Sequence, residues 1–290
     1  MNEAVIAIIC DFDDTLGSDS TSFLLKKNNI PYEEFWPQVY TMVKDSWDPP
    51  LAYMHLLLEY SKKGKIDLSY DALIGLGKKL PLFPGLPQAF SELKEYVRTD
   101  PSLKASRIKL EFYIISGGME AIILGSPIAA AVDGIFGGTF AYDKKTKEAI
   151  GVKSAISFTE KTRFLYGIHK GISVQDIRER PYRTNDAIPQ EQRRIPFSQM
   201  IYIGDGPSDI PSLSTIIRSG GLGIGVSSPH TTFKKGYELA RGKRITVGPY
   251  TANYKKGSDM RKVLEETILR MGLEIDINQK KHVVSAPKVG

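Results

Sequence analysis

AVIAIICDFDDTL, residues 4–16, joins a run of apolar residues to an acidic cluster. Residues 4–9 are apolar, mostly β-branched and too few to span a membrane, so they predict a strand buried on both faces. Asp11, Asp13 and Asp14 follow where that strand ends. Ligands of open α/β sheets bind outside the carboxyl ends of the strands, so the stretch predicts a site for a cation and a nucleophile. Asp and Thr residues are also ordinary turn and helix-capping residues, and this alternative stays open on the stretch alone.

The composition is that of a globular protein with a sizeable core. The chain has 290 residues, of which 41% are hydrophobic, enough for one large domain or one domain with a smaller insertion. Its formal net charge of +6 favours anionic partners in general. No nucleic-acid recognition motif accompanies that charge, so we expect no nucleic-acid partner.

The sequence predicts a soluble, cytoplasmic protein. Its single cysteine, Cys10, cannot form an intramolecular disulfide and is expected to be a small buried hydrophobe. The first ten residues lack the basic leader and the full-length apolar region of a secretory signal. No segment approaches the roughly 20 apolar residues that a membrane-spanning helix needs, so no membrane partner is expected.

Apolar periodicity divides the chain into a core and an inserted helical region. Between residues 18 and 84 the apolar residues recur at helical intervals, and Pro31, Pro49 and Pro50 mark helix starts. This pattern predicts a helical cap at 18–84, a discontinuous core formed by 1–17 and 85–277, and a mobile tail at 278–290. The cap aromatics, Tyr32, Phe35, Trp36, Tyr40, Trp47 and Tyr53, are expected to be mostly core, with one or two lining a pocket.

The core region alternates strand-like and helix-like segments, as in a mostly parallel α/β sheet. Further strands are predicted at 109–115, 134–142, 150–158, 200–203, 223–226 and 244–247, and helices at 86–97, 119–132, 161–170, 232–240 and 259–271. The helix at 119–132 is expected to be broken or kinked by Gly125 and Pro127. Residues 100–109 are predicted to be a polar loop. The Arg-rich stretch 176–196 is interpreted as a solvated surface insertion, with a dedicated anion site as the alternative.

Other chemically useful residues also come at the ends of predicted strands or at a helix start. Ser116, Gly117 and Gly118 follow the second strand, Lys161 begins a helix, and residues 204–209 (GDGPSD) follow a later strand. A parallel sheet gathers such positions along one edge. Carboxylates from two loops suit Mg²⁺, while a hydroxyl, free backbone amides and an ammonium suit the oxygens of a phosphoryl group.

These motifs resemble those of haloacid dehalogenase superfamily phosphohydrolases, in particular the phosphoserine phosphatase-like branch. The matching pieces are DFDDTL at 11–16, YIISGG at 113–118, Lys161 ahead of an amphipathic helix, and IGDGPSD at 203–209. They occur in the order of that family and cover the whole Rossmann-like core, with a cap inserted between the first two. The resemblance implies an α/β fold with a three-layer, Rossmann-like core.

The resemblance also implies a role for each matching residue. Asp11 is expected to be the nucleophile that forms an aspartyl-phosphate, and Asp13 the general acid and base. The expected Mg²⁺ ligands are Asp11, the Asp13 backbone carbonyl and Asp205. Ser116, Gly117 and Lys161 are expected to bind the phosphoryl group. Thr15 is expected to fix the loop, and Asp209 to orient Lys161 or a water on the metal.

Two departures from the family pattern leave alternatives open. Lys161 is unusually far ahead of Asp205, so Lys153 and Lys170 remain weaker candidates for its role. The stretch GSDSTSFLLKKN, residues 17–28, lacks the glutamate with which phosphoserine phosphatases usually read the serine amine. We therefore expect a small phosphorylated metabolite other than phosphoserine.

The predicted activity is Mg²⁺-dependent hydrolysis of a small phosphomonoester. Three other functions are compatible with parts of the same motif set. A phosphomutase or phosphotransferase could use the same nucleophile, and a non-catalytic phosphate-binding protein could keep the same cleft. A dehalogenase would need neither Mg²⁺ nor Asp13. The sequence does not determine the oligomeric state.

Overall fold

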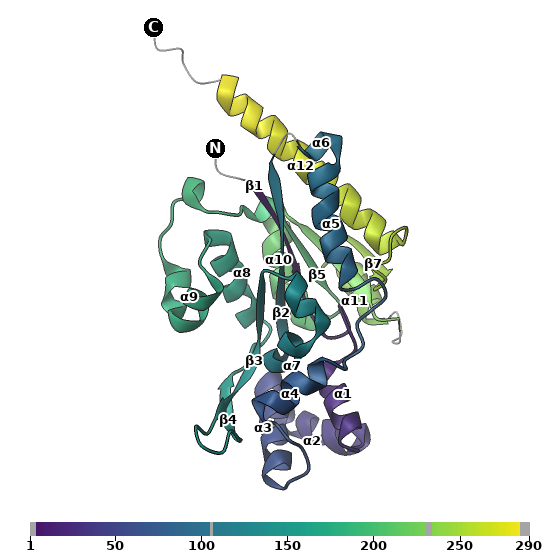
Figure 1. Ribbon diagram of the computed structural model, residues 1–290, viewed down its shortest axis with the longest axis vertical. Coiled ribbons are helices and arrows are strands. Elements are labelled where there is room, and N and C mark those ends of the chain that lie inside the picture. The colour runs from purple at the N-terminus through teal and green to yellow at the C-terminus, as the bar shows by residue number, and fades with distance from the viewer. Residues whose placement is uncertain (1–3, 105–106, 230–233, 285–290) are drawn as a thin grey trace.

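The computed structural model describes residues 4–104, 107–229 and 234–284, and its centre is a mixed β-sheet covered by helices on both faces (Figure 1). The seven strands lie in the order β4-β3-β2-β1-β5-β6-β7, and all neighbours are parallel except the β3–β4 pair. This arrangement confirms the predicted α/β fold. The strands are β1 (Ala4–Cys10), β2 (Ile108–Met119), β3 (Gly134–Tyr142), β4 (Ala149–Ser154), β5 (Met200–Gly204), β6 (Leu222–Ser227) and β7 (Val247–Thr251).

The register of the three central strands brings distant parts of the sequence to one sheet edge. Cys10, the last residue of β1, pairs with Ile114 of β2 on one side and with Ile203 of β5 on the other. The residues that follow each of these positions therefore emerge together at the carboxyl edge. Asp11 remains attached to this frame, because its N–H donates to the Ile203 carbonyl at 2.9 Å.

Strand β1 is buried on both faces because its side chains alternate between two cores. Ile6, Ile8 and Cys10 belong to the larger cluster, with residues of α5 (Gln88–Thr99) and α12 (Asp259–Val284). Val5 and Ile9 belong to the second, with α8 (Glu160–Lys170) and α10 (Ile210–Arg218). The sheet therefore forms the middle of three layers, and Cys10 is a buried free thiol, as predicted.

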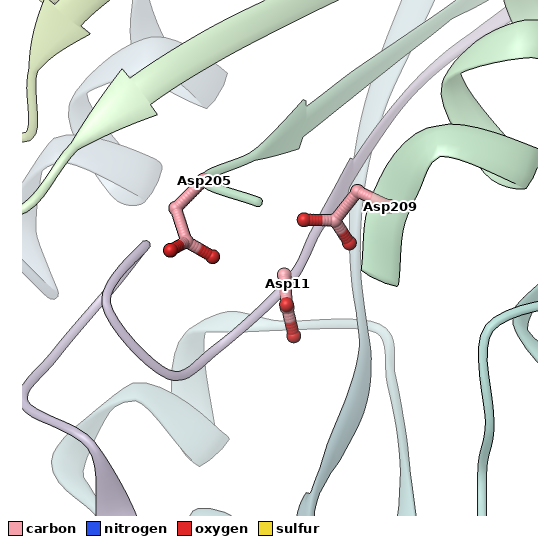
Figure 2. A group of neighbouring side chains, drawn as sticks. All are labelled: Asp11, Asp205 and Asp209. Carbon is pink, nitrogen blue, oxygen red and sulfur yellow. The ribbon is translucent and has the colours of Figure 1, made fainter. Parts of the chain in front are cut away.

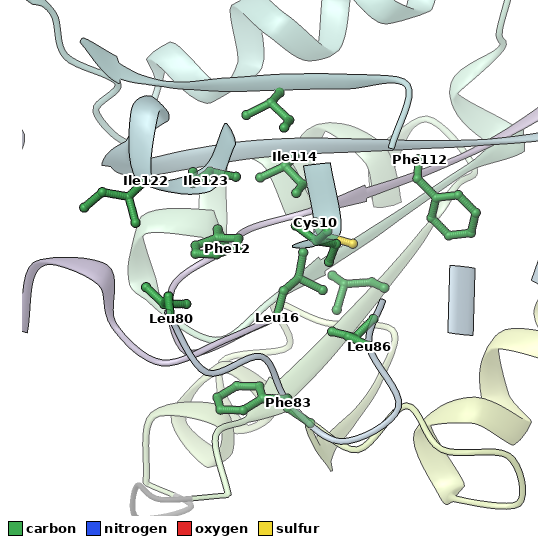
Figure 3. Packing of buried hydrophobic residues seen from close by; sticks show 14 of the residues in the cluster. Cys10, Phe12, Leu16, Leu80, Phe83, Leu86, Phe112, Ile114, Ile122 and Ile123 are labelled. Atoms are coloured by element: carbon green, nitrogen blue, oxygen red, sulfur yellow. The ribbon is translucent and has the colours of Figure 1, made fainter. Parts of the chain in front are cut away.

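The loop after β1 is held by apolar residues placed between its acids. Phe12 and Leu16 are fully buried, and they pack with Ile114 of β2 and with Leu80 and Phe83 (Figure 3). The packing of Phe12 and Leu16 therefore fixes the backbone of the loop from which the acidic side chains extend. This packing explains why a polar motif here alternates with large apolar residues.

Four helices lie together beyond the carboxyl edge of the sheet, at the lower end of Figure 1. They lie within residues 18–84, the range predicted to be a helical cap. The segment that enters the four helices lies beside the segment that leaves them. Gly17 pairs with Leu82 in an isolated β-bridge, and the Ser18 N–H donates to the Pro81 carbonyl. The four helices are α1 (Ser20–Lys27), α2 (Tyr32–Lys44), α3 (Pro49–Lys62) and α4 (Tyr70–Gly77).

Several predicted elements have different bounds in the structure. Strand β7 begins at Val247, whereas 244–247 was predicted, because residues 244–246 instead follow helix α11 (Lys234–Arg241): the Arg244 N–H donates to the Leu239 carbonyl. The first two residues of the predicted helix 232–240 lie outside the described residues. Strand β4 ends at Ser154 and does not continue to residue 158.

The segments around β2 also differ from the prediction. The strand continues through Ser116, Gly117 and Gly118 to Met119, with an irregular register against β3 beyond Ile115. The predicted loop 100–109 contains one helical turn. The predicted helix 119–132 is divided, as expected, near Gly125 and Pro127. These elements are α6 (Pro101–Lys104), α7 (Glu120–Gly125) and a 3₁₀ helix (Pro127–Ala131).

Helix α12 continues to Val284, and so extends into the stretch 278–290 for which a mobile tail was predicted. The polar residues there favour helix through i,i+4 pairing, and Lys280 forms such an ion pair with Asp276. Residues 285–290 lie outside the described residues. None of the helices in the described part of the chain combines the length and apolar character needed to cross a membrane.

The Arg-rich segment 176–196 lies on the surface, and its arginines bond to the rest of the protein. Arg178 donates to Glu120 at 2.9 Å and to the Ile135 carbonyl at 2.6 Å. Arg194 donates to both carboxylate oxygens of Glu111 on β2, at 2.7 and 2.6 Å. The segment is therefore attached to the sheet and is more than a hydrated loop. It contains the end of α9 (Val174–Glu179) and two short 3₁₀ turns, Pro181–Asn185 and Gln190–Gln192.

Helix α4 is joined to α7 of the core by a contact without intervening side chains. A methyl group on Gly77 would lie 2.0 Å from the Ile122 carbonyl oxygen, and one on Gly125 would lie 2.2 Å from the Ile74 carbonyl oxygen. Both distances are shorter than van der Waals contact. The two backbones therefore approach as closely as they do only because both positions are glycine.

This contact predicts that Gly77→Ala destabilises the protein. We expect the free energy of unfolding to fall by about 2 kcal/mol, because the new methyl must displace backbone. Gly75→Ala is the matched control: the same helix has open space around Gly75, and alanine is the better helix former there by about 1 kcal/mol. Urea denaturation of both variants measures the difference, and equal stabilities would contradict the close contact.

The buried carboxylate of Glu111 predicts a loss of stability in acid. Burial would raise the pKa of Glu111, but hydrogen bonds from Arg194, Lys109 and Tyr113 lower it to about 2. The folded state therefore binds this proton more weakly than the unfolded state, where the pKa is 4.5. The resulting stabilisation is complete above pH 4.5 and is lost as the pH falls toward 2. Urea denaturation between pH 6 and pH 3 should show this slope, and Glu111→Gln should reduce it.

A second measurement isolates the arginine partner at neutral pH. Arg194→Met removes the guanidinium that donates to both oxygens of the buried Glu111 carboxylate. We expect the free energy of unfolding to fall by about 2 kcal/mol. Arg180→Met is the control, since Arg180 is 69% exposed and lies 3.7 Å from Asp176. That loss should stay below about 0.5 kcal/mol. A smaller loss for Arg194 than for Arg180 would refute the assignment.

Candidate active site

A buried lysine connects the two acidic motifs. Lys161 Nζ lies 2.9 Å from Asp11 Oδ2 and 2.7 Å from Asp209 Oδ1, and the lysine is 1% exposed. Asp11 follows β1, Lys161 lies in the first turn of α8, and Asp209 ends the 3₁₀ helix that follows β5. Three elements far apart in sequence thus meet at one ammonium group.

Asp209 is held in place from several directions. The Tyr202 hydroxyl donates to its Oδ1 at 2.8 Å, and the Gly206 N–H donates to its Oδ2 at 3.3 Å. Burial raises the pKa of Tyr202, so the phenol stays protonated and acts as a donor. A side chain at Gly204 would collide with Asp209, because its first carbon would lie 2.4 Å from Oδ2. The glycine in IGDGPSD therefore makes room for the carboxylate.

The charges of this cluster depend on each other. Burial, together with Asp209 and against the attraction of Lys161, raises the pKa of Asp11 to about 6. Burial alone would lower the pKa of Lys161, but Asp11 and Asp209 together raise it. Lys161 is therefore charged and Asp11 is mostly ionised at neutral pH. The Phe12 N–H also donates to Asp11 Oδ1 at 2.7 Å and holds the carboxylate.

Asp205 completes an acidic group with the chemistry of a cation site. One carboxylate oxygen from each of Asp11, Asp205 and Asp209 lies within 4.8 Å of the others, and Figure 2 shows the three side chains close together, Asp11 after β1 and the other two in the segment after β5. Carboxylate oxygens are the hard donors that Mg²⁺ takes, so the residues present are compatible with the predicted ion.

Asp13 lies beside this group and bonds to the start of the helical region. Its Oδ1 accepts from the Ser20 N–H at 2.7 Å, and the Ser20 hydroxyl lies 3.1 Å from its Oδ2. Burial, with Asp19 and Asp11, raises the pKa of Asp13 well above its usual range. A methyl at Gly118 would lie 2.5 Å from Asp13 Oδ2, so glycine is needed there. A carboxyl group with a raised pKa takes up a proton more readily and is suited to donate it.

Ser116 and Gly117 lie on the last part of β2, opposite these acids. Ser116 is fully buried, and its Oγ accepts from the Gly118 N–H at 3.0 Å. The Gly117 carbonyl accepts a hydrogen bond from Tyr53 of helix α3. Both residues line the same pocket as Asp11 and Asp13. The strand end is thus held by a side chain from the helical region.

The two remaining residues of the first motif serve the loop. Thr15 is fully buried, and its carbonyl accepts from the Tyr254 hydroxyl at 2.9 Å. Among the described residues its Oγ1 has no hydrogen-bond partner. Asp14 has a positive φ of 56°, and its N–H donates to the Gly17 carbonyl at 2.9 Å. Asp14 is therefore a turn residue, as the capping interpretation expected.

The two alternative lysines lie elsewhere. Lys170 donates to the carbonyls of Thr184 and Asp186, at 2.6 and 2.8 Å, and so ties α8 to the Arg-rich segment. Lys153 is exposed on the edge strand β4. Of the three candidates, the structure places Lys161 beside Asp11.

A pocket of about 320 Å³ opens over the acidic group. Its floor comes from the sheet edge and includes Asp11, Asp13, Ser116 and Asp205. Its opposite wall comes from the helices beyond that edge. A larger hollow of about 710 Å³ between β3, β4 and α9 is lined by Lys153, one of the two alternative lysines, and by none of the other predicted site residues.

Three residues that hold the site were not predicted. Tyr202 precedes IGDG inside a run that reads as buried strand, Ser20 lies in a polar connector, and Tyr53 was grouped with the cap aromatics. Only Tyr202 carried a signal, since a hydroxyl within a buried strand needs a partner. Which partner it would find depends on the fold.

Comparison with other proteins gives one relative and several similar folds. No protein-family model matches the chain. A protein of Borreliella burgdorferi, described only as uncharacterized, is 30% identical over 292 aligned residues, which cover 92% of this chain and 97% of that protein.

Solved structures with related folds share little sequence. A gene product of Archaeoglobus fulgidus has a TM-score of 0.54 at 12% identity, covering 98% of this chain and 88% of that one. Cytosolic 5′-nucleotidase IIIB bound to cytidine has 0.51 at 13%, covering 96% and 88%. A substrate-bound phosphoserine phosphatase has 0.50 at 14%, covering 91% and 99%. The chain belongs to the same family as the Borreliella burgdorferi protein, and its fold is similar to those of the phosphoserine phosphatase and the 5′-nucleotidase.

Proposed function

We propose that the protein is a phosphatase that hydrolyses a small phosphomonoester through an aspartyl-phosphate on Asp11. The observation that carries this proposal is the buried Asp11–Lys161–Asp209 arrangement, with Asp205 and Asp13 beside it. A structural ion pair alone would not need further carboxylates at a pocket floor. Perturbed, coupled carboxyl groups in a cleft are typical of catalytic sites.

Asp11 is the proposed nucleophile. Its carboxylate is fixed by the Phe12 N–H and Lys161, so it is oriented before the substrate arrives. Attack on phosphorus forms the Asp11 O–P bond and breaks the bond to the leaving alcohol oxygen. Lys161, with Ser116 and the nearby backbone amides, would stabilise the negative charge of the transferring phosphoryl group. Splitting the displacement into two steps lowers each barrier.

Asp13 is the proposed proton donor and acceptor. Its raised pKa lets it hold a proton until the alcohol oxygen leaves. The same carboxylate then accepts a proton from the water that attacks the aspartyl-phosphate, so the protons balance over the cycle. Ser20 keeps the side chain directed by its two contacts to the carboxylate oxygens.

Mg²⁺ would be held by Asp11, Asp205 and the Asp13 backbone carbonyl. When bound, it would offset the repulsion between the nucleophilic carboxylate and an anionic phosphate. Asp209 would keep Lys161 in place. The helices at 18–84 would act as a cap that excludes water from the pocket. A cytoplasmic location and the absence of nucleic-acid and membrane partners stay predictions.

The nucleophile is tested by Asp11→Asn. We expect phosphate release from p-nitrophenyl phosphate to fall at least about a thousandfold, because an amide cannot form the aspartyl-phosphate. Asp14→Asn is the matched control, because it makes the same change three residues after Asp11. Asp14 has a positive φ, which asparagine tolerates. It should stay within a few-fold of wild type. Full activity of Asp11→Asn with an intact fold, shown by circular dichroism, would disprove the mechanism.

The metal site is tested by thermal unfolding with and without MgCl₂. Mg²⁺ that binds only the folded state stabilises it, by about 2.7 kcal/mol at a hundred times its dissociation constant. We expect Mg²⁺ to raise the Tm of the wild type and to have little effect on Asp205→Asn. Glu191→Gln, an exposed acid of the Arg-rich segment, should respond like the wild type. A wild type whose Tm and activity are both insensitive to Mg²⁺ and to chelators would exclude the metal.

A further inference from the structure

A single peptide bond connects the helical region to the serine of the second motif. The Tyr53 hydroxyl of α3 donates to the Gly117 carbonyl, and the Gly118 N–H donates to Ser116 Oγ at 3.0 Å. That carbonyl and that N–H belong to the same peptide bond, and in a trans peptide they point in opposite directions. The groups therefore form one chain of hydrogen bonds, which runs from the Tyr53 hydroxyl through the peptide to Ser116.

The direction of each hydrogen bond in this chain is fixed by chemistry. A carbonyl oxygen can only accept, so the Tyr53 hydroxyl is the donor. Burial, with nearby carboxylates, raises the pKa of Tyr53, so the phenol keeps the proton that it donates. A backbone N–H can only donate, so Ser116 Oγ accepts from Gly118. The proton of the Ser116 hydroxyl is then left for another acceptor, and within the described residues it is donated to none.

Ser116 lies where the phosphoryl group would bind. The residue is fully buried, and it lines the pocket together with Asp11 and Asp13. Gly118 is packed between these groups, since a methyl there would lie 2.5 Å from Asp13 Oδ2 and 3.3 Å from Ser116 Oγ. The peptide that supports Ser116 is therefore in close contact with the proposed general acid, and the free proton of Ser116 is beside the proposed nucleophile.

We propose that Tyr53 is a positioning residue for the phosphoryl group, which acts through the peptide bond between Gly117 and Gly118 to keep the Ser116 hydroxyl a donor toward the phosphoryl oxygens. This inference rests on the proposed phosphatase function and deepens it. In a chain of hydrogen bonds each bond polarises the next, so donation by Tyr53 strengthens the hydrogen bond that Ser116 gives at the other end. Loss of the phenol oxygen would leave the Gly117 carbonyl without this donor and the peptide less firmly held.

Two other roles for the Tyr53 hydroxyl predict different results. The hydroxyl could only fix α3 to the sheet, as the Tyr53 ring does within the helical region by packing 6.4 Å from the Trp36 ring, measured between centroids. Removing such a bond would lower the free energy of unfolding and leave the phosphate site unchanged. Tyr53 also lines the pocket, so the hydroxyl could contact the leaving group of the substrate. That contact would have no effect on a ligand without a leaving group.

The test begins with Tyr53→Phe, which removes only the hydroxyl. We expect kcat/KM for p-nitrophenyl phosphate with Mg²⁺ to fall about tenfold, as for the loss of one buried hydrogen bond. The inhibition constant of orthovanadate, which has no leaving group, should rise by a similar factor. Tyr60→Phe is the matched control, because Tyr60 lies on the same helix and its hydroxyl donates to Glu34 of α2 at 2.8 Å. It should leave both constants unchanged.

A double-mutant cycle with Ser116→Ala identifies the route. If Tyr53 acts through Ser116, Tyr53→Phe should have little further effect in the Ser116→Ala protein, so the two losses should not multiply. Losses that multiply, in kcat/KM and in the orthovanadate constant, would overturn the inference. Wild-type constants for Tyr53→Phe would do the same. Circular dichroism shows whether each variant is folded, and the shift in Tm caused by orthovanadate repeats the cycle from binding alone.

The outcomes also separate this inference from the function on which it rests. If the wild type hydrolyses p-nitrophenyl phosphate in an Asp11-dependent reaction and Tyr53→Phe behaves like it, the phosphatase function stands and the role of Tyr53 is wrong. If the wild type binds orthovanadate without hydrolysing the ester, the proposed function is wrong, and the binding cycle still decides whether Tyr53 acts through Ser116. Neither hydrolysis nor orthovanadate binding in the wild type would overturn both.

Discussion

The contact of one lysine ammonium with two carboxylates is the interaction on which the site depends. Lys161, Asp11 and Asp209 are all buried, and removing such charges from water costs several kcal/mol each unless the partners are well placed. Placement requires β1 and β5 in register and α8 packed across them. The sheet therefore has to be rigid for the ions to be stable, and the ions in turn leave Asp11 ionised and oriented toward the pocket.

Much of this arrangement could be predicted from the sequence, because the key residues follow apolar runs. Asp11 and Asp205 come directly after β1 and β5, and Ser116 lies near the end of β2, in a register that aligns Cys10 with Ile114 and Ile203. The helix start at Lys161 was also visible. The hydrogen-bond partners were not: that Tyr202 would reach Asp209, or Ser20 reach Asp13, follows only from the three-dimensional packing. Segment bounds were wrong where a capping bond or an ion pair, at 244–246 and 276–280, outweighed the apolar pattern.

The helices beyond the sheet edge contribute to the site as well as cover it. Ser20 bonds to Asp13, Tyr53 holds the Gly117 carbonyl, and Trp36 and Tyr40 line the same pocket as the acids. In the proposed reaction the core would bind the phosphoryl group, which every phosphomonoester shares, and the helices would meet the part that differs. Exchange of the helical segment could then change the substrate without changing the chemistry.

The glycine contact between α4 and α7 is one of several contacts that fix the helices beyond the sheet edge to the core. Helix α4 is fixed to the core by backbone contact, α1 is tied through Ser20, and α3 through Tyr53. Helix α2, which carries Trp36 and Tyr40, packs on α3, and the Tyr60 hydroxyl of α3 donates to Glu34 of α2. The part of the pocket that α2 lines is therefore positioned by the same contacts that fix α3 to the core.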